Sequence, residues 1–147
     1  MEEQKKPAGK PFTFPKQVEY GINIAFNAIF LIIVNNILAW GVLPWLTQDF
    51  KKLIWLFNLS IIASIAANVI FLFFNADWFT SLIKFFLNII SLVLGIRMLQ
   101  VFPFDFSAYS FDWALVIRII LIVSIVGISI AILAELVKFI ASVSKRV

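Results

Sequence analysis

The sequence predicts an all-α membrane protein with four transmembrane helices in an antiparallel bundle. Of its 147 residues, 63% are hydrophobic and 14% are charged, whereas a soluble domain has about 45–50% apolar and about 25% charged residues. The apolar residues form four continuous runs, each long enough to cross a hydrocarbon core of about 30 Å. These runs lack the alternation of barrel strands, so helices, which pair their own backbone groups, are expected.

The four spans are expected at about residues 18–43, 53–75, 79–102 and 113–140. Their short connections, including a tight turn at residues 75–77, imply antiparallel neighbours. Residues 17–147 then form one membrane domain. Residues 1–16 form a basic tail that contains three prolines. This tail is either solvated or rests on anionic headgroups, with Phe12 and Phe14 at the interface.

The distribution of charge predicts the orientation in the cell membrane. The N-terminal tail carries four lysines and the C-terminal end three basic residues, whereas the loop over residues 103–113 carries only acids. Cytoplasmic segments are enriched in Lys and Arg, so both termini are expected in the cytoplasm. Lys51 and Lys52 in the first loop weaken this contrast without reversing it.

Spans 1 and 2 carry polar residues at helical spacing. Asn23 and Asn27 share one face of span 1, and span 2 repeats a polar residue every four positions, at Ser60, Ser64 and Asn68. Amides and hydroxyls in hydrocarbon seek partners on neighbouring helices, so helix packing is expected. A water-lined polar path is the alternative.

Spans 3 and 4 each carry a stripe of small or polar residues that predicts close packing between them. A charge pair between Lys84 and Glu135 would set the register of this hairpin and place Gly95 opposite Ser124. Glu19 and Lys138 are competing partners for the two charges. The full packing stripe comprises Asn88, Ser91, Gly95, Ser124, Gly127 and Ala131.

Arg97 and Arg118 lie at one depth, each about 9 Å along its helix from the loop that joins spans 3 and 4. They are expected to snorkel outward or to hold an anionic lipid headgroup, phosphate or partner acid between them. Alternatively, each arginine reaches Asp105 or Asp112 of its own loop.

The same loop is rich in aromatic residues, including Phe104, Phe106, Tyr109 and Phe111. Aromatic rings are enriched at membrane interfaces, which explains the composition without a partner. The other interpretation is a surface that docks a partner protein.

The chain contains no Cys and no His, which removes disulfides, thiolate nucleophiles and Cys/His zinc sites. No nucleotide-binding, metalloprotease or calcium-loop motif occurs, and no two acids lie close within one span. We therefore expect no enzyme activity, no cofactor and no nucleic-acid partner. The leading interpretation is a structural or accessory subunit, associating in the bilayer with itself or with a larger membrane complex. The alternative is a homo-oligomeric pore or small transporter that uses the amide-bearing faces of spans 1 and 2.

Overall fold

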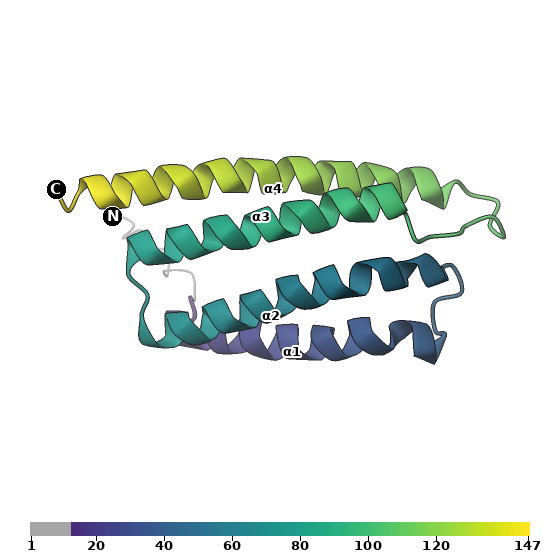
Figure 1. The fold of residues 1–147 in the computed structure, drawn as a ribbon, viewed down its shortest axis with the longest axis horizontal. Coiled ribbons are helices and arrows are strands. Elements are labelled where there is room, and N and C mark those ends of the chain that lie inside the picture. The colour runs from purple at the N-terminus through teal and green to yellow at the C-terminus, as the bar shows by residue number, and fades with distance from the viewer. Residues whose placement is uncertain (1–12) are drawn as a thin grey trace, which may run out of the picture.

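The computed structural model describes residues 13–147 and consists of four long helices joined by loops (Figure 1). The helices are α1 (Lys16–Trp40), α2 (Lys51–Phe73), α3 (Asp77–Val101) and α4 (Trp113–Ser144), and a short 3-10 helix, η1 (Gln48–Phe50), precedes α2. Each of the four is long and apolar enough to cross a membrane. The predicted fold class, a multi-pass four-helix membrane protein, is confirmed. The predicted tail falls largely outside the described residues.

Local sequence explains where the helices end. α1 ends at Gly41, whose φ of 61° lies in the left-handed region that glycine adopts without strain. α3 ends at Phe102, with a φ of 42°, because the following Pro103 disfavours a helical conformation in the residue before it. Asp112 caps the start of α4, because its carboxylate accepts a hydrogen bond from the Leu115 backbone nitrogen at 3.0 Å.

The helices form two hairpins, α1–α2 and α3–α4, and α2 packs more lightly on α3 (Figure 1). Near the start of α1, Tyr20, Ala67 and Phe71 form an apolar cluster to which α3 contributes three side chains. Near the other end of the bundle, a second cluster centres on Val34, Phe50 and Ile61 and includes Met98 of α3. Apolar contacts therefore join the two hairpins near both ends of the bundle.

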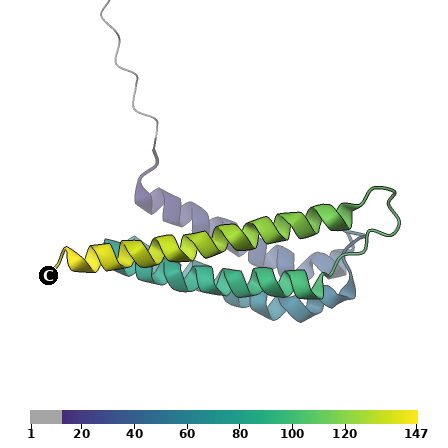
Figure 2. The same ribbon diagram turned by 90° about the horizontal axis from the view of Figure 1, so that it is seen from above.

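The two loops at the end of the bundle away from the C-terminus lie against each other (Figure 2). The Thr47 backbone nitrogen donates to the Pro103 carbonyl oxygen at 2.9 Å, and the Asp105 nitrogen donates to the Trp45 carbonyl oxygen at 2.8 Å. Leu46 and Phe104 form an antiparallel β-bridge between these bonds. The first and third loops thus fasten the hairpins together at this end.

α4 contacts the rest of the molecule mainly through α3. It contains no buried residue, and large apolar side chains such as Ile122, Val126 and Leu133 are exposed. In a bilayer these side chains face lipid tails, which solvate them as well as a protein core does.

Candidate functional site: a polar cavity between the hairpins

A cavity of about 490 Å³ lies between the two hairpins. Its polar lining comes from all four helices, whereas aromatic and aliphatic side chains from α1, α2 and α3 complete the wall. The polar lining residues are Asn27, Ser60, Ser64, Lys84, Asn88, Ser91 and Glu135. Sites for small molecules are commonly apolar cavities with a few convergent polar groups, and their volumes are about 300–1,000 Å³.

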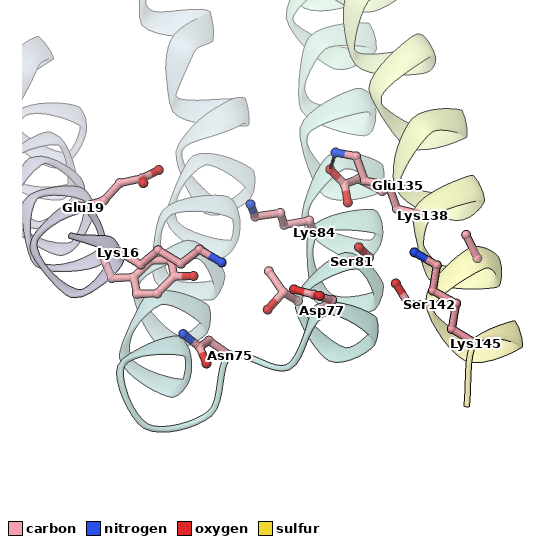
Figure 3. A pocket seen from close by; sticks show the side chains of 13 residues that line it. Lys16, Glu19, Asn75, Asp77, Ser81, Lys84, Glu135, Lys138, Ser142 and Lys145 are labelled. Carbon is pink, nitrogen blue, oxygen red and sulfur yellow. Dashed lines mark hydrogen bonds and ion pairs between the residues drawn. The ribbon is translucent and has the colours of Figure 1, made fainter. Parts of the chain in front are cut away.

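A second hollow of about 410 Å³ shares Lys84 and Glu135 with the first and extends to the helix ends beside the C-terminus. Figure 3 shows charged side chains from α1, α3 and α4 around it. Its charged lining residues are Lys16, Glu19, Asp77, Lys84, Glu135, Lys138 and Lys145. The two hollows give one continuous polar surface, from the helix ends into the bundle. We call the first the inner cavity and the second the outer cavity.

The inner cavity reaches the middle of the membrane-spanning region. At about 1.5 Å per residue, Ser91 lies about 21 Å along α3 from Asp77, near the helix midpoint. Ser60 lies about 20 Å from Phe73, the end of α2 on the same side. Ile61 lines the cavity and also belongs to the apolar cluster beyond it. The polar surface therefore ends against packed side chains at mid-depth.

The polar side chains in the inner cavity have unused hydrogen-bonding capacity. On α4, Ser124 and Ser129 each donate to the carbonyl oxygen four residues earlier, at 2.8 Å. Within residues 13–147, the side chains of Ser60, Ser64, Asn88 and Ser91 make no hydrogen bond to protein. An unpaired polar group in hydrocarbon costs several kcal/mol, about the cost of a lost hydrogen bond or more. The described residues therefore leave these side chains without the hydrogen-bond partners that polar groups at this depth need.

The charges between the two hollows do not pair as the sequence suggested. Glu135 Oε1 lies 3.0 Å from Lys138 Nζ, one turn along the same helix, and the expected contact between Lys84 and Glu135 is not formed. Lys84 instead extends from α3 toward α2 (Figure 3). Lys138 lies one turn from Glu135 on the same helix, so the two side chains can pair however α3 and α4 are packed against each other. This explains why Glu135 pairs with Lys138, the competing partner, and not with Lys84.

No protein-family model, curated protein or solved structure matches this chain. Among residues 13–147, no three acidic side chains gather as metal ligands.

The five residues of the predicted polar path do not all line one cavity. Asn27, Ser60 and Ser64 line the inner cavity. Asn68 is 8% exposed and donates to the Ser64 carbonyl oxygen at 2.8 Å, so it is packed within the protein. Asn23 lies at a separate small hollow near the start of α1, and its carbonyl oxygen accepts from Asn27.

The residues of the predicted packing stripe between α3 and α4 also differ in their surroundings. A side chain at Gly95 would meet Ile125 Cγ1 at 3.2 Å, so this glycine marks a close approach. The neighbour of Gly95 is thus Ile125, one residue from the expected Ser124. A side chain at Gly127 would meet nothing within 4 Å. Asn88 and Ser91 line the inner cavity, and Ala131 is half-buried.

Arg97 and Arg118 have separate environments. Arg97 Nη1 donates to Gln100 Oε1 at 3.1 Å, and the Arg118 guanidinium lies 4.0 Å from the centre of the Phe102 ring. Within residues 13–147 neither forms an ion pair with the loop acids.

The two loop acids have local partners instead. Asp112 caps α4, and a hydrogen bond from the Ser107 backbone nitrogen lowers the pKa of Asp105. The expectation that each arginine reaches a loop acid is corrected, since both acids serve the local backbone.

The aromatic loop is partly used inside the molecule. The Trp45 ring lies 5.8 Å from Phe104 and 5.6 Å from Phe106. Tyr109 and Phe111 remain 45% and 58% exposed. Trp45, Phe106, Tyr109, Trp113 and Ile117 line a mainly apolar groove here. Of the four predicted docking residues, Tyr109 and Phe111 are thus the more accessible.

Asn58 is a polar contact residue that the sequence patterns did not reveal. Its side chain exchanges hydrogen bonds with that of Asn35 across the α1–α2 interface. Both asparagines lie within about two turns of the loop between their helices. This similar distance from the loop was the sequence pattern from which their contact could have been predicted.

Proposed function

We propose that this membrane protein is a small transporter that admits a polar solute to the inner cavity through the outer one. The unpaired side chains of Ser60, Ser64, Asn88 and Ser91 are the observation that carries this proposal. Purely structural serines in these helices have the simpler solution that Ser124 and Ser129 use. Polar groups that face a cavity at membrane depth are typical of solute and ion pathways.

A polar cavity that ends at mid-depth corresponds to one of the two states that alternating access requires. In the other state, the far side would open and the outer cavity would close. The far side is held by the loop contacts of Thr47 and Asp105 and by the apolar cluster around Val34. Rocking of one hairpin against the other would have to separate these contacts.

Cysteine accessibility tests the proposal, and the cysteine-free chain provides a clean background. Ser60→Cys and Ser91→Cys should react with a small water-soluble thiol reagent applied from the side of the C-terminus. Ser129→Cys is the matched control, because Ser129 lies on α4 and lines neither hollow, and it should react far more slowly. Equal protection of all three cysteines would contradict a hydrated pathway.

A role as an accessory subunit is the second candidate. The groove beside the exposed Tyr109 and Phe111 supports it, since exposed aromatic side chains are frequent interface anchors. The mass of the native assembly in mild detergent, compared between the parent and a Tyr109→Ser/Phe111→Ser double variant, tests this role. An unchanged mass would argue against docking through this loop.

A further inference from the structure

Lys84 is the innermost cation of the continuous polar surface. It lies about 10 Å along α3 from Asp77, lines both hollows and extends toward α2 (Figure 3). Among residues 13–147 it makes no ion pair or hydrogen bond. An ammonium group at this depth requires water or an anion, because hydrocarbon solvates a charge poorly.

The acids around Lys84 do not cancel its charge. Glu135 is the acid nearest the inner cavity, and Lys138 already pairs with it at 3.0 Å; the Glu135 side chain is only 12% exposed. Glu19 and Asp77 lie closer to the mouth, where Lys16 and Lys145 balance them. Lys84, Glu135 and Lys138 together leave one positive charge at the junction of the two hollows.

Neutral hydrogen-bonding groups continue inward from Lys84. Asn88 and Ser91 follow it at one and two turns on the same face of α3, and both line the inner cavity without a protein partner. Ser60 and Ser64 face the same space from α2. From the helix ends inward, the lining of the inner cavity therefore presents first the Lys84 cation and then neutral amide and hydroxyl groups.

We propose that Lys84 binds the oxyanion group, a carboxylate or a phosphate, of a small anion that enters the cavity. Asn88 and Ser91 hydrogen-bond to the rest of that molecule. This assignment rests on the proposed transport role, and it names the class of solute: an anion with polar groups, and not a cation or an apolar molecule. An anionic lipid headgroup offers the same oxyanion chemistry from the membrane side.

Thermal unfolding of the purified protein in phosphatidylcholine nanodiscs tests the assignment. Sodium phosphate or sodium acetate, at constant ionic strength with sodium chloride, should raise the Tm in a saturable manner. Glycerol and choline chloride should not. Lys84→Gln should weaken the apparent affinity for the anion at least about tenfold, since hydrogen bonds to charged groups contribute strongly. Lys84→Arg should keep the response, and so should Lys51→Gln, which removes a lysine at the other end of the molecule.

A second readout separates binding from a structural role. Without added anion, Lys84→Gln should unfold at a Tm no lower than the parent, because it removes an unpaired charge. A clearly lower Tm together with an unchanged anion response would overturn the assignment. A response to glycerol or choline alone, with Ser91→Cys still reactive, would also overturn it while leaving the transport proposal standing.

Two further outcomes distinguish the assignment from the function on which it rests. If Ser60→Cys and Ser91→Cys are protected but phosphate still raises the Tm through Lys84, the anion site is supported and transport through the cavity is wrong. If only nanodiscs containing phosphatidylglycerol raise the Tm, and Lys84→Gln removes this effect, the oxyanion belongs to a lipid headgroup. That result supports the site and overturns a soluble anionic solute.

Discussion

Asn35 of α1 and Asn58 of α2 exchange two amide hydrogen bonds, 2.7 Å and 3.0 Å long, across the first hairpin. Asn35 also donates to the Leu31 carbonyl oxygen at 2.7 Å. Each amide thus fills both its donor and its acceptor role within the protein. This pair fixes the register of α1 against α2 by chemistry that apolar contacts cannot supply.

The asparagine pair predicts a non-additive response to substitution. Asn58→Leu leaves the Asn35 side chain half-paired and should lower the free energy of unfolding by about 1 kcal/mol. The Asn35→Leu/Asn58→Leu double variant should recover most of this loss, because no unpaired amide remains. Reversible unfolding in mixed detergent micelles compares the parent, the single variants Asn35→Leu and Asn58→Leu, and the double variant. A double variant as unstable as the two single variants combined would contradict the pairing.

Gly95 and Gly127 form a matched pair for testing the α3–α4 interface. Gly95→Leu places a large side chain against Ile125 and should destabilise the protein by about 1–3 kcal/mol, as overpacking does. Gly127→Leu points into open space and should be tolerated. Thermal unfolding of both variants in the same detergent gives the comparison. Equal losses would show that the close approach at Gly95 is not specific.

The contact between the first and third loops predicts a disulfide. Leu46 and Phe104 are bridge partners, and antiparallel partners have Cβ atoms about 4.5–5.5 Å apart, near the range a disulfide spans. Leu46→Cys/Phe104→Cys should lose both free thiols under mild oxidation, as counted by mass spectrometry. The two single-cysteine variants serve as controls for bonds between molecules. Retention of both thiols would mean that the loops lie apart.

The placement of basic residues predicts that both termini lie on the cytoplasmic side of the membrane. An impermeant thiol reagent on intact cells should label Ser107→Cys, in the loop that we expect outside. Lys10→Cys, in the basic tail, should be labelled only after permeabilisation. The reverse pattern would invert the topology, and the outer cavity would then open to the exterior.

The sequence was sufficient to predict the helices because their length and apolar content are local properties. The runs near 18–43 and 113–140 correspond to α1 and α4, although α4 continues to Ser144. Gly95 contacts Ile125, one residue from the position that a Lys84–Glu135 pair would have set, although that pair is not formed. Residue patterns thus predicted the helices, whereas the reason given for the register was wrong.

Side-chain partners could not be predicted in the same way. Glu135 forms its ion pair with Lys138 and not with Lys84. Which lysine pairs with it depends on where the long lysine side chains can extend once the hairpins are packed. The Asn35–Asn58 pair depends on how α1 and α2 are rotated about their own axes. Because both helices are apolar on all sides, their sequences do not determine this rotation. The cavity itself is a property of the space between hairpins, and no single helix carries its signature.

The division into two tight hairpins has a consequence for biogenesis. α1 packs chiefly on α2 and α4 chiefly on α3, so each hairpin can form its internal contacts as soon as its second helix has been synthesised. Asn35 would therefore remain unpaired in the membrane only until Asn58 leaves the ribosome. We expect the chain to enter the bilayer as two successive helical pairs, with the polar cavity created last, when the second pair docks on the first.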